Sequence, residues 1–217
     1  MEDNLIKDIA GSLLPILFAI TMHEVAHGWV ALMLGDKTAA RMGRLSLNPI
    51  HHIDPIGTVL VPSLSYLFGG FLFGWAKPVP VNFGRLRHPR RDSALVALAG
   101  PMANLLMAIC WALMVRLAHA VDIENLTAPL AYMGERGIGF NLVLMLLNLL
   151  PILPLDGGRI VSALLPPRVS YRYDSTEQYG MLIMLVLIAI PGLLGVILGP
   201  PMAVFLSLMS LFAGLSG

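Results

Sequence analysis

Long apolar runs, separated by short polar segments, dominate the pattern along this chain. A helix that crosses the hydrocarbon core of a bilayer needs about 20 mostly apolar residues. Five runs approach that length, and they cover residues 5–34, 93–118, 130–153, 179–198 and 201–215. The pattern therefore predicts an all-α polytopic membrane protein whose helices are joined by short loops.

A sixth apolar stretch, residues 56–75, is interrupted by Pro62, Ser63, Ser65, Gly69, Gly70 and Gly74. Such interruptions fit a re-entrant segment as well as a full span, so we expect five to six transmembrane segments. Pro200 and Pro201 separate the last two runs. That separation predicts a C-terminal helical hairpin over residues 178–216.

The composition excludes a soluble domain. Hydrophobic residues make up 57% of the 217 residues and charged residues only 12%, whereas soluble domains carry about 25% charged residues. We expect one membrane-embedded domain over residues 1–217, with its core over 5–165. The net charge of +1, with no basic tail, argues against a nucleic-acid partner. The acidic N-terminus lacks the basic region of a cleaved signal peptide, and the single Cys110 allows no internal disulfide.

The distribution of Lys and Arg predicts the orientation, because these residues favour the cytoplasmic side. If residues 56–75 enter and return, the loops 35–55, 76–92 and 157–176 share one side. That side then holds eleven Lys and Arg, against three on the other. If the stretch crosses, the better split is nine against five. The first arrangement is favoured, and it places the ends of the first and third spans at the cytoplasmic side.

The first apolar run contains the pattern H-E-x-x-H, formed by His23, Glu24 and His27. Residues four apart lie on one face of a helix, so both imidazoles can reach one zinc ion, and Glu24 can take a proton from an activated water. The alternative is that the three side chains snorkel or make hydrogen bonds inside a bundle. Ionisable residues within a span are expensive and usually functional, which favours the metal site.

A catalytic zinc site needs a third protein ligand, and Asp156 is the best candidate. It follows an apolar run and two prolines, and it precedes Gly157 and Gly158. This pattern places a carboxylate where a helix breaks and the backbone is free to bend. On its own the residue would fit a loop aspartate at the membrane surface, but next to H-E-x-x-H we favour a ligand role.

Three motifs in this order resemble the site-2 proteases, a family of intramembrane zinc metalloproteases. The residues that carry the resemblance are His23-Glu24-Val25-Ala26-His27, Gly100-Pro101-x-x-Asn104 and Asn148-x-x-Pro151-x-x-Pro154-x-Asp156-Gly157-Gly158. The short connecting segments look like a compact prokaryotic branch without a PDZ or CBS domain. The resemblance implies one zinc per chain, held by His23, His27 and Asp156, with Glu24 as the base and proton shuttle.

The resemblance also points to Asn148 as a donor that holds the oxyanion of the reaction. Two helical turns before Asp156, it could face the same cavity. An interhelical hydrogen bond, which polar residues in spans often make, fits the residue equally well. Asn104 fits such a bond better than a role in the chemistry.

Two short alternating patterns predict a small β element at the cytoplasmic side. Residues 44–47 and 78–83 alternate apolar with polar or proline positions, which is typical of strands. Prolines confine the second strand to an edge, where it could accept a substrate strand; an ordinary surface hairpin fits the pattern as well. His51 and His52 could form a second metal site or lie over the zinc, but a turn before Pro55 is the preferred interpretation.

Together these patterns predict an intramembrane zinc endopeptidase in the cell membrane, with its active site toward the cytoplasmic side. The resemblance implies a single-span substrate, such as a membrane-held transcription regulator or a remnant signal peptide. One alternative is a metal transporter, although the last two runs carry almost no polar ligands. Another is a proteolytically silent homologue that binds helices, and the presence of Glu24 argues against it. The sequence carries no indication of oligomeric state.

Overall fold

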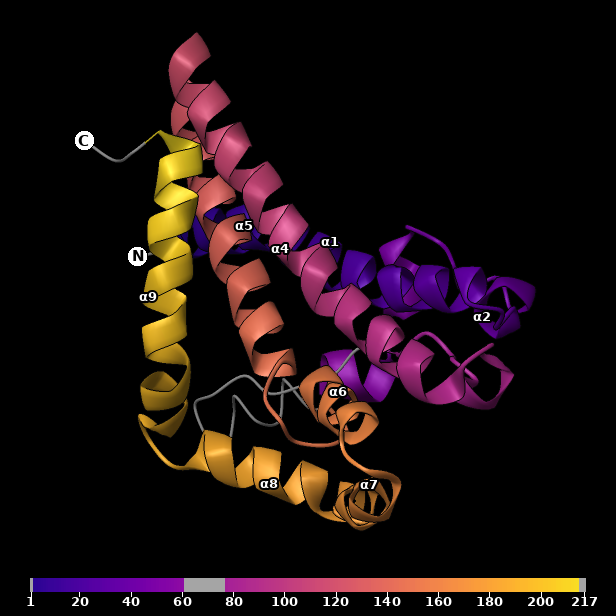
Figure 1. Cartoon of the computed structure of the whole chain (residues 1–217). Helices are drawn as coiled ribbons and strands as arrows, with labels where there is room; N and C mark the ends of the chain where they lie inside the picture. Colours follow the sequence, from indigo (N-terminus) through magenta and orange to yellow (C-terminus); the bar gives the residue numbers. More distant parts are fainter. Residues whose placement is uncertain (1, 61–76, 215–217) are drawn as a thin grey trace.

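The computed structural model of this chain describes residues 2–60 and 77–214, and every regular element within them is helical. The predicted all-α class is therefore confirmed for these residues. Figure 1 shows the helices in chain order. The longer elements are α1 (Glu2–Met33), α4 (Pro89–Val121), α5 (Thr127–Asn148), α8 (Glu177–Ala189) and α9 (Leu193–Ala213), and the shorter ones are α2 (Thr38–Arg41), η1 (Pro49–His52), η2 (Pro55–Leu60), η3 (Phe83–Arg85), α6 (Asp156–Leu164) and α7 (Pro167–Asp174).

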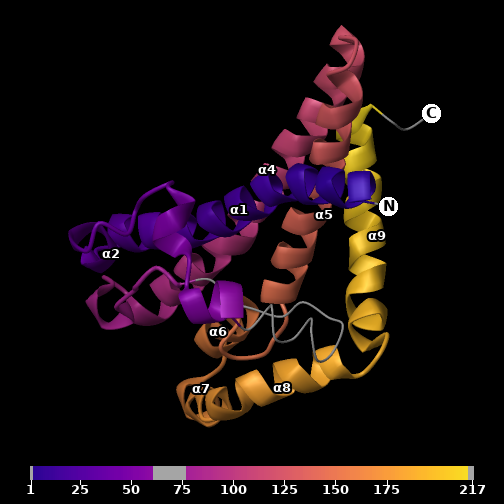
Figure 2. The ribbon, with the colours of Figure 1, turned by 180° about the vertical axis from the view of Figure 1, so that it is seen from behind.

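The core lies where α4, α5 and α9 pack together (Figure 1). α5 approaches α4 closely because two glycines face it: a Cβ on Gly137 would overlap the Trp111 ring, and one on Gly134 would overlap Val115. Small residues allow this close backbone approach between helices in lipid. α1 packs against α4 and α5 and crosses them at a steep angle in both views (Figures 1 and 2).

Four helices are long and apolar enough to cross a membrane, namely Gly11–Met33 within α1, Pro89–Val121, Thr127–Asn148 and Leu193–Ala213. The expected count of five to six is not confirmed by the described residues. α8 has 13 residues, or about 20 Å at 1.5 Å per residue, which is short of the roughly 30 Å hydrocarbon core. Residues 61–76, which include most of the stretch expected to re-enter or cross, lie outside the described part of the chain.

The break between α8 and α9 falls at Ile190–Gly192, not at Pro200-Pro201 as the sequence suggested. Ile190 is extended, with ψ at 111°, because the ring of Pro191 disfavours a helical residue before it. Gly192 then takes φ +79°, which glycine adopts readily. Pro200 and Pro201 lie inside α9. In Figure 1 α8 runs across the lower end of α9, so the two do not pair as an antiparallel hairpin.

The expected β element is not confirmed in the described residues. Residues 44–48 and 77–82 form no strand. They do lie against one another, because the Arg44 guanidinium donates to the carbonyl oxygens of Lys77 (3.1 Å) and Pro78 (3.3 Å). Pro78 and Pro80 have no N–H to contribute to a ladder, so side chains hold the two segments together instead.

Candidate metal centre

α1 presents His23 and His27 one turn apart on the face that packs against α4 and α5. Both imidazoles are oriented through Nδ1: that of His27 donates to the Val96 carbonyl oxygen at 2.7 Å, and that of His23 donates to Asn104 Oδ1 at 2.6 Å. A hydrogen bond from one ring nitrogen leaves the other as a free lone pair for a metal. Both Nε2 atoms therefore face the same point with acceptor character.

Asn104 itself is fixed by a chain of hydrogen bonds. Its amide nitrogen donates to the Ala19 carbonyl oxygen (3.1 Å) and to Asn141 Oδ1 (3.0 Å), which leaves Oδ1 to accept from His23. Asn141 in turn donates to the Gly137 carbonyl oxygen at 2.8 Å. Both asparagines are fully buried, so this chain connects α1, α4 and α5 beneath the imidazole.

Asp156 reaches the histidines from the turn that follows α5. α5 ends at Asn148, and Asp156 is the first residue of α6. The intervening loop folds back over the first turn of α6, where a Cβ on Gly158 would lie 2.6 Å from backbone atoms of residues 152 and 153. A Cβ on Gly157 would overlap the backbone of Leu149 and Leu150. The two glycines are therefore required for the loop that carries the carboxylate to α1.

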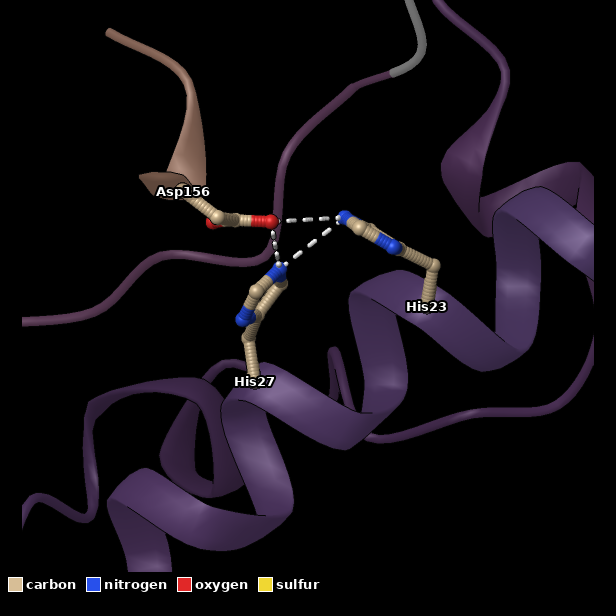
Figure 3. Close-up of side chains that lie close together, drawn as sticks. All are labelled: His23, His27 and Asp156. Carbon is tan, nitrogen blue, oxygen red and sulfur yellow. Dashed lines mark hydrogen bonds and ion pairs between the residues drawn. The ribbon is translucent and has the colours of Figure 1, made fainter. Parts of the chain in front are cut away.

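Three atoms converge from these elements, as Figure 3 shows. His23 Nε2 lies 3.1 Å from His27 Nε2, and Asp156 Oδ2 lies 3.3 Å and 3.4 Å from them. Ligands about 2.0–2.1 Å from a tetrahedral zinc are separated by about 3.4 Å, so this triangle has the size that zinc requires. Asp156 Oδ2 is buried and makes no hydrogen bond. A cation at this point would satisfy that oxygen and both lone pairs.

α4 closes one side of the site through Gly100. A Cβ at this position would lie 2.5 Å from His23 Cε1 and 2.6 Å from His27 Cε1, and nearer still to His27 Nε2. Carbon atoms in contact are normally 3.5 Å or more apart. The absence of a side chain at residue 100 therefore lets the imidazoles occupy their observed positions.

Glu24 lies beside the first histidine, and its Oε2 accepts a hydrogen bond of 2.7 Å from the backbone N–H of Val79. The structure thus brings a segment distant in sequence to the side chain expected to act as the base. This backbone donor was not anticipated from the sequence, because an N–H group leaves no signature in the residue types.

The remaining predicted residues lie in other settings. The Asn148 amide donates to the Leu144 carbonyl oxygen of its own helix at 2.9 Å, and its expected role as an oxyanion donor stays a prediction. His52 is buried and its Nε2 lies 2.9 Å from the Ser46 carbonyl oxygen, while His51 is exposed. These contacts favour the turn interpretation for the histidine pair. Asn104 makes the interhelical hydrogen bond expected of it, and its partner is the candidate ligand His23.

Comparisons with known proteins match this chain to zinc metalloproteases. The model of Peptidase family M50 matches residues 113–191. "Putative zinc metalloprotease YwhC" of Bacillus subtilis is 44% identical over 179 residues, which cover 81% of this chain and 78% of that relative. "Putative zinc metalloprotease Rip2" of Mycolicibacterium smegmatis is 31% identical over 183 residues, and its namesake in Mycobacterium tuberculosis 32% over 179; this chain spans 66% of the length of each. No solved structure matches the chain.

Proposed function

Because this chain belongs to peptidase family M50, the site-2 proteases, we propose that it hydrolyses a peptide bond in or near the transmembrane segment of membrane proteins. Its enzyme class is that of a zinc metalloendopeptidase. The observation that carries the proposal is the triangle of His23 Nε2, His27 Nε2 and Asp156 Oδ2 at zinc-like spacing. Two of these three atoms belong to residues of α1, a helix long and apolar enough to cross a membrane.

In this proposal the three residues hold the zinc, which supplies a Lewis acid and an activated water when bound. Glu24 accepts the proton of that water through its carboxylate and later passes it to the amine that leaves. Asn148 donates its amide N–H to the oxygen that gains negative charge on the scissile carbonyl. That step requires the amide to turn away from the Leu144 carbonyl oxygen, which it contacts in the structure.

The burial of the site supports a substrate that enters from within the membrane. His23 is only 8% exposed, and the buried asparagine pair lies beneath its imidazole. Substrates are then expected to be single-span proteins whose helix unwinds beside α1.

The positions of the basic loops support an active site toward the cytoplasmic side. The 35–55 loop contacts the 76–92 loop through Arg44 and the Pro78 carbonyl oxygen. The 76–92 loop contacts the 157–176 segment, because Arg90 donates to the Ala163 carbonyl oxygen at 3.0 Å. All three basic segments therefore meet at one end of the molecule, where the positive-inside tendency places the cytoplasm.

Glu24→Gln tests the proposed function. The chain is purified in detergent, its zinc is measured, and it is reconstituted into liposomes with a tagged single-span test protein. We expect the unmodified chain to cleave the test protein in or near its span, with activity lost on chelation and restored by zinc. Glu24→Gln should keep zinc and lose turnover. Casein, a soluble protein without a span, serves as the control.

Equal cleavage of casein and the membrane protein would contradict the preference for transmembrane segments. Full turnover in Glu24→Gln would remove Glu24 as the base. Zinc flux into the liposomes that persists in Glu24→Gln, without cleavage, would favour a transporter instead.

A further inference from the structure

The segment 77–82 is held in place along α1 by contacts at several points. Its first N–H, that of Lys77, donates to the His52 carbonyl oxygen at 2.9 Å. Its last, that of Asn82, donates to Asp36 Oδ2 at 2.7 Å. Between them the Val79 N–H donates to Glu24 Oε2 at 2.7 Å. One irregular segment thus joins the proposed base to the loop after α1.

The sequence of this segment allows only one register opposite Glu24. Val79 lies between Pro78 and Pro80, and neither proline has an N–H. A slip by one residue in either direction would place a proline at the carboxylate and leave it without the donor. Prolines on both sides also restrict the backbone to an extended form. Val79 therefore presents a single N–H from a stiff segment.

Close approach of the segment to α1 depends on Gly28, one turn after Glu24. A Cβ on Gly28 would lie 2.7 Å from Val79 Cγ1 and 2.5 Å from Leu45 Cδ2. Val79 is 6% exposed, so its side chain fills the space that the glycine leaves. The backbone N–H reaches the carboxylate only because residue 28 lacks a side chain.

The far end of the segment is anchored by a carboxylate that stays ionised. Asp36 is 1% exposed. Burial opposes its ionisation, but hydrogen bonds from the Thr38 hydroxyl, the Asn82 N–H and the Thr38 N–H, with the charge of Arg85 nearby, lower the pKa of Asp36 below its usual value. An ionised acceptor makes a stronger hydrogen bond with a backbone N–H than a neutral one. This anchor limits movement of Val79 along α1.

We propose that Val79 is a positioning residue whose backbone N–H holds the Glu24 carboxylate in its working orientation. The bond occupies Oε2 and leaves Oε1 to exchange the proton with the water of the reaction. This inference rests on the proposed function, since it assigns a partner to the base of that reaction. Orientation of a reacting group by a fixed neighbour is a general source of rate, and loss of such supporting bonds typically costs 10- to 100-fold.

Hydrogen exchange tests the contact without any substrate. Deuterium uptake is measured at single-residue resolution over residues 77–83 in detergent, for the unmodified chain and for Glu24→Ala. We expect the Val79 N–H to exchange about 10- to 100-fold faster in Glu24→Ala, since a hydrogen bond to a charged acceptor contributes about 1.5–3 kcal/mol. The Asn82 N–H should be unchanged. Equal exchange of Val79 in the two proteins would overturn the proposal.

Turnover of the single-span test protein distinguishes a positioning role of the Val79 N–H from a packing role of the Val79 side chain. Val79→Pro removes the N–H and keeps an extended backbone. We expect kcat to fall about 10- to 100-fold, with KM within about twofold and zinc retained. Val79→Ala keeps the N–H and should recover kcat relative to Val79→Pro. Val81→Pro is the matched control, because it removes a neighbouring N–H that does not reach Glu24.

Gly28→Ala gives an independent perturbation if Val79→Pro folds poorly. Its added methyl pushes Val79 away while every N–H remains, so kcat should again fall with zinc retained. An unchanged kcat in Val79→Pro, an increased kcat, or an equal loss in Val79→Ala would each overturn the proposal. If the unmodified chain cleaves no single-span protein, the proposed function fails, whereas the exchange measurement still reports whether Val79 holds Glu24.

Discussion

Gly100→Ala is the substitution for which the structure predicts the sharpest effect on the metal. In an exposed helix, replacing glycine by alanine usually stabilises a protein by about 0.5–1 kcal/mol. At residue 100 the new methyl would instead meet both imidazoles, 2.5 Å from His23 Cε1 and 2.6 Å from His27 Cε1. The gain in helix propensity cannot relieve that overlap, so either α4 or the histidines must move.

The size of the movement decides the outcome. Carbon atoms need about 3.5 Å, so the imidazoles or α4 must shift by roughly 1 Å. Metal–ligand distances tolerate only about 0.2 Å. The His23 and His27 rings are also tied to Asn104 and to the Val96 carbonyl oxygen, which restricts how they can rotate away. We therefore expect zinc affinity to fall by at least the 10- to 100-fold typical of a disturbed ligand environment.

The assay is zinc content per chain, measured in detergent across a series of chelator-buffered zinc concentrations. Gly139→Ala is the open control, because nothing lies within 4 Å of the added carbon. Gly134→Ala is the steric control: it overlaps Val115 and approaches Met114, so it should lower the melting temperature without changing the affinity for zinc. Unaltered zinc affinity in Gly100→Ala would refute the reasoning, because the ligand triangle would then not depend on the space at residue 100.

Three further predictions concern the ligands, their support and the anchor of the segment 77–82. Asp156→Ala should lose zinc; a full complement of tightly bound zinc would exclude Asp156 as a ligand. Asn104→Leu leaves the His23 Nδ1–H without its partner, so zinc affinity measured by chelator competition should fall about 10- to 100-fold; equal affinity would assign Asn104 to packing. The pKa of Asp36 in the folded protein lies below its unfolded value of about 3.9. The ionised carboxylate therefore stabilises the fold fully above the unfolded pKa, and this stabilisation is lost as the pH falls through the folded pKa. The melting temperature of the unmodified chain should therefore exceed that of Asp36→Asn at pH 6, and the difference should shrink below pH 4; a constant difference would contradict the role assigned to ionisation.

The proposed ligand set could be predicted from the sequence because each part of it has a local signature. His23 and His27 share a helix face through their spacing, which places both imidazoles on the same side of α1. Asp156 could be predicted because acidic residues are rare in this apolar chain, and this one follows an apolar run and precedes two glycines. In the structure its carboxylate lies within 3.4 Å of both imidazoles.

The features that escaped prediction depend on tertiary packing or on backbone groups. The steric need for Gly100 appears only once α4 lies against the histidines. The contact between Val79 and Glu24 uses an N–H that any residue except proline would offer. The break at Ile190–Gly192 escaped prediction because the pair Pro200-Pro201 is the stronger sequence signal for a helix end, although α9 continues through it. Gly199, which precedes Pro200, has no Cβ to clash with the proline ring, and this helps α9 to continue through the pair.

The buried polar groups around His23, His27 and Asp156 form one connected arrangement, and the atoms in it that lack a partner point to the metal. A buried polar group without a partner costs several kcal/mol in an apolar environment. Asn141 and Asn104 have partners for their amide groups, and the Nδ1 of each histidine has an acceptor. Within this arrangement the two Nε2 lone pairs and Asp156 Oδ2 remain without a partner, and these three atoms meet within 3.4 Å of one another. Three electron-rich atoms that face one another repel, so the supporting hydrogen bonds, which fix this orientation, stabilise the site only when a cation completes it.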